Sequence, residues 1–208
     1  MVVILTGMSC VGKDRVREEL GREYNFTNIV SYTSRPIREN ETDGIDYNFV
    51  SKEEFKRMID NNEMIEYRSY NTLFNNISDT WYYGIKKEDL DIDKNYVVVL
   101  DLDGTERFIQ HYHDTQNYLI IYLSASDSIR KRRAINRGSF DITEWNRRVI
   151  ADKIDFSRDR RYSLQERYSL FEINNNKQGK RYIQDIAAFI SNVCYMDNAG
   201  YFLSIGEI

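Results

Sequence analysis

The sequence predicts an α/β fold with a mostly parallel central sheet flanked by helices. Three observations support this: apolar runs alternate with charged stretches of helical periodicity, the first run ends in a glycine-containing turn, and a later run ends at carboxylates. Sites in such folds lie beyond the carboxyl ends of the strands, so we expect the functional residues there. The expected strands are Val2–Leu5, Ile29–Val30, Tyr96–Leu100, Tyr118–Leu123 and Leu170–Ile173, and a helix is expected at Lys52–Asp60.

Composition and charge limit the function classes. The 208 residues suffice for one well-cored domain, and no linker, repeat or low-complexity block divides them. The formal net charge of −4 supplies no general basic field for nucleic acid or anionic lipid. No apolar run has the length of a membrane span, and the first strand stands where a cleavable signal would be. We expect a cytoplasmic monomer or homodimer that binds neither nucleic acid nor membrane, with Cys10 and Cys194 as buried thiols.

The strongest local signal follows the first strand. Gly7, Gly12 and Lys13 have the spacing G-x-x-x-x-G-K, and a helical pattern runs from Gly12 to Leu20. Such a loop turns its backbone N–H groups around a polyphosphate, with the lysine near the β- and γ-phosphates and the positive helix end behind them. A glycine turn with a surface lysine is the plain alternative, but the flanking strand and helix favour phosphate binding. The expected binding residues are Gly7, Ser9, Cys10, Val11, Gly12, Lys13 and Asp14.

Two aspartates are candidate magnesium ligands. Asp14 stands where such loops carry Ser or Thr, whose hydroxyl ordinarily ligates Mg²⁺. It either binds the metal directly or acts only as a charge at the helix N-terminus that repels a triphosphate when metal is scarce. Asp101 ends the run Val97–Leu100, as the acidic group of a Walker-B strand does, although strand-end aspartates also cap helices.

Residues 32–84 are polar and aromatic and predict a subdomain inserted after the second strand. Within it, Arg35 and Arg38, followed by Tyr47, could hold a phosphate dianion. Glu66, on a short strand-like run, could accept two N–H bonds from a guanine edge. Taken alone, the arginines would be better interpreted as a solvated basic turn and Glu66 as a surface glutamate. A second phosphate site beside a phosphate loop, however, is what a nucleoside monophosphate kinase requires.

Residues 130–148 are the densest basic stretch of an acidic chain and predict a mobile lid. Most charge runs are solvated helix faces, but arginines on a closing lid can stabilise the charge of a transferring phosphoryl group. Arg133 and Arg137, four residues apart, would share one helix face.

Together these residues resemble the guanylate kinase family over roughly Val2 to Ile190. The phosphate loop, Gly7 to Lys13, matches the motif of the family, and the segment from Ser31 to Ser51 matches its GMP-binding signature at unbroken spacing. The resemblance implies a P-loop kinase fold with an inserted GMP-binding subdomain and a helical lid. Its single domain would comprise a core of residues 1–31, 85–129 and 149–190, the insertion 32–84, the lid 130–148 and a tail of residues 191–208.

The resemblance also implies roles for individual residues. The phosphate of GMP would be bound by Arg35, Arg38, Tyr47 and Tyr83, and the guanine would be read by Ser31, Glu66 and Asp103. Catalysis would rest on Lys13 and the lid arginines Arg133, Arg137 and Arg148. Asn174 would lie near the adenine of ATP, and Asp101 would organise Mg²⁺.

The chain departs from the family pattern at four places: Asp14, Cys10 in place of glycine, Ile85 in place of a Ser or Thr that contacts the base, and a longer segment 70–82. The expected activity is ATP- and Mg²⁺-dependent phosphorylation of GMP or dGMP. The sequence Gly12-Lys13-Asp14 also resembles ribose 1,5-bisphosphate phosphokinases, and a non-catalytic guanylate-kinase-like interaction module is a further alternative.

Overall fold

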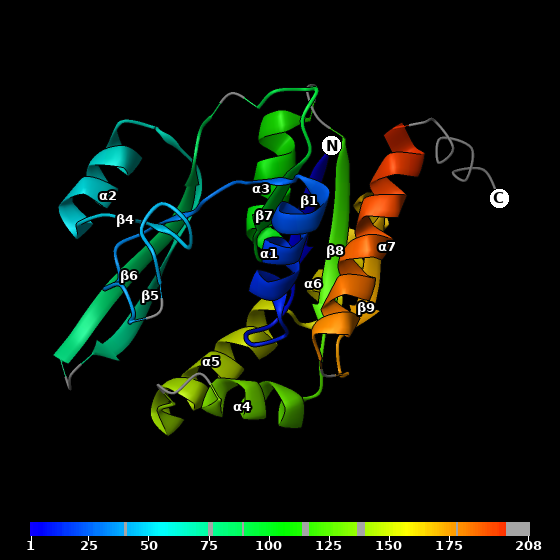
Figure 1. Ribbon diagram of the computed structural model, residues 1–208. Coiled ribbons are helices and arrows are strands. Elements are labelled where there is room, and N and C mark those ends of the chain that lie inside the picture. The colour runs from blue at the N-terminus through cyan, green and yellow to red at the C-terminus, as the bar shows by residue number, and fades with distance from the viewer. Residues whose placement is uncertain are drawn as a thin grey trace.

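Two sheets organise the computed structural model, which describes residues 1–39, 41–74, 77–88, 90–113, 117–136, 140–177 and 179–198 (Figure 1). The larger sheet is parallel, in the order β2-β7-β1-β8-β9. The parallel sheet and its flanking helices confirm the predicted fold class. Its strands are β1 Val2–Thr6, β2 Thr27–Asn28, β7 Tyr96–Val99, β8 Tyr118–Ser124 and β9 Leu170–Asn174. The helices are α1 Lys13–Tyr24, α2 Lys52–Asp60, α3 Leu102–Tyr112, α4 Asp127–Ile135, α5 Ile142–Asp155, α6 Arg158–Arg167 and α7 Lys180–Asn198.

The predicted strand at Ile29–Val30 was wrong, whereas the other four strands were predicted to within a residue at either end. The second strand is the two-residue β2, which pairs only with β7 at the edge of the sheet. Ile29 is buried, and its N–H still donates to the Val97 carbonyl at 2.9 Å, but the chain then leaves the sheet toward the insertion. Because β2 is an edge strand, Ile29 and Val30 have only β7 to pair with, and the strand ends before them.

The central strand β1 is buried on both faces, which accounts for its uninterrupted apolar sequence. Val3 and Leu5 pack with α1 and α7, whereas Val2 and Ile4 pack with α3 and α6, and all four side chains are fully buried. The two faces alternate residue by residue, as the period of a strand requires. The loop that follows β1 is thus anchored by the most buried element of the fold.

The second sheet has the order β4-β3-β6-β5 and lies to one side of the main sheet (Figure 1). It has its own small core, in which Phe55 and Met58 of α2 pack with Met64. Residues 70–74 and 77–82 lie on β5 and β6, which pair antiparallel along nearly their whole length. The strands are β3 Tyr32–Thr33, β4 Asn48–Phe49, β5 Met64–Phe74 and β6 Ile77–Lys86.

Helix α2 has the predicted bounds because its ends are encoded locally. The Ser51 hydroxyl accepts from the Glu54 N–H at 3.0 Å and caps the first turn.

At the other end of the chain, α7 continues through residues 191–198, where Cys194 is buried. Cys10 and Cys194 are both buried, as expected. Among the described residues, no helix combines the length and the apolar character needed to cross a membrane.

Candidate active site

One cleft of about 330 Å³ runs between the loop after β1, the second sheet and α5. Figure 1 shows α4 and α5 beyond the carboxyl ends of β8 and β9. This is the edge of the parallel sheet at which the site was expected. The predicted site residues that line this cleft are Gly7, Ser9, Cys10, Gly12, Lys13, Asp14, Ser31, Arg35, Arg38, Tyr47, Glu66, Tyr83, Asp101 and Arg148. Val11, Asp103, Arg133 and Asn174 do not line it, and Arg137 lies outside the described residues.

The loop from Gly7 to Lys13 needs its glycines for two reasons. Gly7 has φ 136°, and a Cβ there would lie 2.2 Å from the Leu123 carbonyl oxygen. Gly12 has φ 103°, and a Cβ there would meet the Asn175 amide nitrogen at 2.7 Å. The Lys13 ammonium donates to the carbonyls of Gly7, at 2.6 Å, and of Met8, at 3.0 Å, so its charge is held along the loop.

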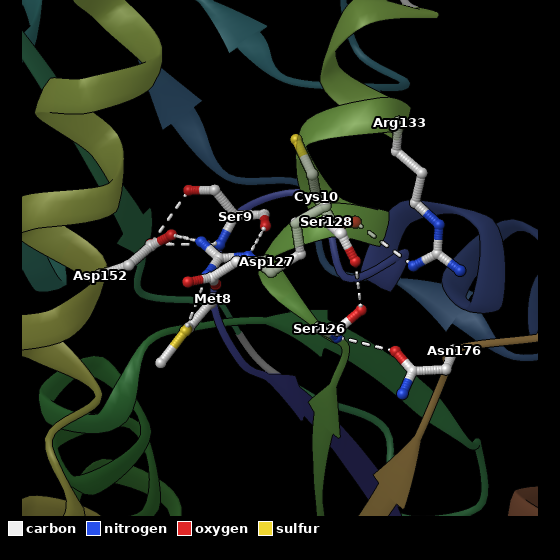
Figure 2. A network of polar contacts seen from close by, with 10 residues as sticks. Met8, Ser9, Cys10, Ser126, Asp127, Ser128, Arg133, Asp152 and Asn176 are labelled. Atoms are coloured by element: carbon white, nitrogen blue, oxygen red, sulfur yellow. Dashed lines mark hydrogen bonds and ion pairs between the residues drawn. The ribbon is translucent and has the colours of Figure 1, made fainter.

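Ser9 is clamped from both sides by a buried ion pair. Its backbone N–H and hydroxyl reach the Asp152 carboxylate at 3.0–3.1 Å, and its carbonyl accepts from Arg130 Nε at 2.8 Å. Arg130 also pairs with Asp152 directly, although its side chain is only 1% exposed. Figure 2 shows Asp152 reaching from α5 to Ser9, with Met8 beside it. The pair therefore ties the phosphate loop to α4 and α5.

A second set of contacts supports the loop near Val11. Arg133 donates to the Val11 carbonyl at 2.9 Å and to the Asn175 carbonyl at 2.7 Å, and the Asn175 amide donates to Val11 at 2.7 Å. Asn175 is fully buried, whereas Asn174 is exposed and its side chain accepts from the Asn176 N–H at 3.1 Å. In this arrangement Asn175 contacts the phosphate loop, next to the Asn174 predicted to lie near the adenine.

Across the cleft, the insertion presents an anion pocket. Arg35 is held by a bidentate pair with Glu41, at 2.7 and 2.6 Å, and its guanidinium lies 5.0 Å from the centre of the Tyr47 ring. Burial and the positive charges of Arg35 and Arg148 lower the pKa of Arg38, so these cations are close enough to repel one another. A bound anion would relieve that repulsion.

Two tyrosines close this pocket. The rings of Tyr47 and Tyr83 meet edge to face, with centroids 6.0 Å apart. Burial, followed by the charge of Asp14, raises the pKa of Tyr47 to about 12, and burial also raises the pKa of Tyr83. Both phenols are therefore neutral hydrogen-bond donors at physiological pH, as the binding of a phosphate dianion requires.

The far end of the cleft is lined by carboxylates. Glu66 is 7% exposed, and burial, together with the charge of Asp101, raises its pKa to about 7. Asp101 caps α3 by accepting from the Gly104 N–H at 2.9 Å and is ion-paired with Arg68. Asp103, in the first turn of α3, pairs with Arg160 of α6. Both strand-end aspartates thus have arginine partners.

Comparison with known proteins decides the family. The guanylate kinase family model matches residues 1–191. The chain belongs to the guanylate kinase family.

Curated guanylate kinases show the same relationship. The enzyme of Lactiplantibacillus plantarum is 33% identical over 173 residues, covering 79% of each chain. That of Enterococcus faecalis is 31% identical over 166 residues, covering 76% of this chain and 74% of the relative. The crystal structure of guanylate kinase from Anaplasma phagocytophilum shares the fold, with a TM-score of 0.62 and 23% identity over 95% of this chain and 85% of that one.

Three side chains of this guanylate kinase site were not singled out in the sequence: Arg68, Arg130 and Asp152. Arg130 stood in the basic run, but nothing in the local sequence separates this buried arginine from the exposed Lys131 and Arg132 beside it. Asp152 follows Arg130 by 22 residues, so the pair forms only when α4 and α5 dock on the loop. The available signal for Arg68 was its place two residues after Glu66 on a strand-like run, which puts both side chains on one face of the strand.

Proposed function

We propose that this chain transfers the γ-phosphoryl group of ATP to GMP or dGMP and releases the diphosphate. The observation that carries the proposal is one cleft lined together by the phosphate loop, by the arginines and tyrosines of the insertion and by Glu66. A donor phosphate, an acceptor phosphate and a guanine base would each find complementary groups there. Membership of the guanylate kinase family supports the same activity.

The donor side would bind ATP through the loop amides from Gly7 to Gly12 and the ammonium of Lys13. The Lys13 ammonium, which now donates to two loop carbonyls, would need only a small movement to donate to the phosphates instead. Arg133 and Arg148 would add positive charge from α4 and α5, and Arg137 joins them in the proposal on its sequence position alone. Such groups stabilise the charge that spreads over the transferring phosphoryl group.

The acceptor side would hold the GMP phosphate between Arg35, Arg38, Tyr47 and Tyr83. The phosphate is itself an anionic nucleophile, so the protein needs no general base. Its task is to exclude water and to align acceptor and donor, which is where most of the rate enhancement of phosphoryl transfer arises. Ser31, Glu66 and Asp103 would read the base, and Asn174 remains the proposed neighbour of the adenine.

The donor set fits Mg²⁺ bound with ATP. Mg²⁺ usually takes one or two protein carboxylates together with phosphate oxygens and water. Asp14 is exposed at the start of α1, and Asp101 lines the same cleft. We propose these two carboxylates as its protein partners, and Asp101 would keep its ion pair with Arg68 when the nucleotides are bound. The metal would supply neutralisation of the phosphate charge.

The proposal is tested by measuring ADP release with GMP, dGMP, AMP, UMP and ribose 1,5-bisphosphate as acceptors. Turnover of GMP or dGMP alone is the expected result. Turnover of the sugar bisphosphate without GMP would identify a ribose 1,5-bisphosphate phosphokinase, and no turnover with any acceptor would identify an interaction module. Lys13→Met should abolish turnover while GMP still binds, whereas Lys131→Met, at an exposed position on α4, should leave turnover unchanged.

A further inference from the structure

If GMP is the acceptor, as proposed above, its guanine O6 can accept two hydrogen bonds at the base end of the cleft, and the Ser31 hydroxyl would supply one of them. The guanine edge that faces a carboxylate presents two N–H donors beside the O6 acceptor. Glu66, when ionised, has acceptors only, so it suits the two donors and repels O6. A complementary site therefore needs a hydrogen-bond donor next to Glu66, because a buried oxygen without a partner weakens binding.

The residue after Gly84 does not supply that donor. Ile85 pairs with Glu66 across the β5–β6 hairpin, so it lies at the right level of the cleft. Its side chain is apolar, only 1% exposed, and packs in the core beneath the main sheet with residues such as Ile29 and Leu102. No hydroxyl is available at this position.

Arg68 is placed to take over this task. It follows Glu66 by two residues on β5, so both side chains lie on the same face of the strand. Arg68 Nε lies 3.8 Å from Glu66 Oε2, and the side chain lines the cleft. Its Nη1 is ion-paired with Asp101, which holds the guanidinium in place.

One nitrogen of this guanidinium, Nη2, has an ion-pair contact but no hydrogen bond. It is buried, makes no hydrogen bond to the described residues, and lies 3.7 Å from Asp103 Oδ2. Proteins seldom bury a charged donor without a hydrogen bond, because the lost hydration is not replaced. An acceptor supplied by a ligand would satisfy it. Arginine is the side chain most often found on guanine O6 and N7.

We propose that Arg68 is a specificity-determining residue that donates from Nη2 to the O6 of the guanine, beside the two N–H groups bound by Glu66. Asp101 positions the guanidinium through its ion pair with Nη1, so the contact of Arg68 with the base depends on the position of Asp101. Adenine presents an amino group in place of O6, so two hydrogen-bond donors, this amino group and Arg68 Nη2, would face each other. Arg68 thus adds to the selection of guanine where Ile85 contributes no hydrogen bond.

The test pairs a change in the protein with a change in the base. kcat/KM is measured for GMP, for 6-thio-GMP, which keeps both N–H donors but replaces O6 with a weakly accepting sulfur, and for IMP, which keeps O6 but lacks the 2-amino group. Arg68→Met should reduce kcat/KM about ten- to hundredfold for GMP and IMP, the range of one good polar contact to a base. For 6-thio-GMP the reduction should be less than about threefold.

Arg167→Met is the matched control, because Arg167 pairs with Glu106 of α3, lies on α6 and does not line the cleft. It should change kcat/KM by the same factor for all three nucleotides. An equal loss for all three nucleotides in Arg68→Met would overturn the proposal and leave Arg68 as a support for Asp101. Arg68→Gln, which keeps N–H donors without charge, should recover part of the preference for O6, and it replaces the methionine variant if that protein does not fold. Absence of any GMP turnover by the unaltered protein would instead refute the proposed function.

Discussion

Glu66 is expected to make GMP binding depend on pH. The side chain is 7% exposed, and burial, with the charge of Asp101, raises its pKa to about 7, while Arg68 acts in the opposite direction. The carboxylate accepts both guanine N–H groups, whereas the neutral acid presents an O–H donor. For a pKa of about 7, the ionised fraction rises from roughly one tenth at pH 6 to roughly nine tenths at pH 8. GMP affinity should therefore rise about tenfold over this interval.

The same shift makes the free energy of unfolding depend on pH. The folded-state pKa of Glu66 lies above its ordinary value of 4.5, so the fold favours the neutral form. The resulting stabilisation is present below pH 4.5 and is lost as the pH rises through about 7. The loss amounts to about 3 kcal/mol for a shift of this size. Glu66→Gln cannot ionise, so it should be more stable than the unaltered protein at pH 8, by up to about 3 kcal/mol.

Calorimetric titration with GMP at pH 6, 7 and 8, without ATP, measures the first effect, and urea unfolding at pH 4.5 and 8 measures the second. The GMP phosphate itself titrates near pH 6, as phosphate monoesters do, and affects both proteins equally. The informative quantity is therefore the ratio of affinities between the unaltered protein and Glu66→Gln. A ratio that stays constant from pH 6 to pH 8 would refute the reasoning.

Three further predictions concern the phosphate loop and its supports. Asp152→Asn removes one counter-ion of the buried Arg130 and leaves it paired with Asp127, so it should lower the free energy of unfolding by about 1.5–3 kcal/mol. Asp155→Asn, at a partly exposed position, should cost under about 1 kcal/mol, and equal losses would contradict the clamp. Cys10 has φ 63°, so Cys10→Val should be less stable than Cys10→Gly by about 1–3 kcal/mol in urea unfolding, and equal stability would argue against the left-handed conformation. Asp14→Ser should raise the Mg²⁺ concentration that gives half-maximal turnover, and an unchanged titration would leave Asp14 as a charge at the helix end.

Much of the fold was predictable because its signals are local. A strand buried on both faces is a run of apolar residues, and the glycines of the phosphate loop are required by positive φ and by the Leu123 carbonyl. The cap at Ser51 marks the start of α2. The edge strand β2 was placed two residues late, because an edge strand of two residues has too few partners to leave a pattern.

The sequence by itself determined the fold class, the phosphate loop and the family resemblance, since each rests on residues close together in the chain. Only the tertiary structure decided which charges are buried and what they pair with. Arg130 reaches Asp152 from another helix, and Arg68 reaches Asp101 from the second sheet to the end of the first. Residues distant in the chain meet only when both sheets and α5 enclose the cleft. The physical reason is that burial multiplies the strength of a charge interaction, and burial is a property of the packed molecule.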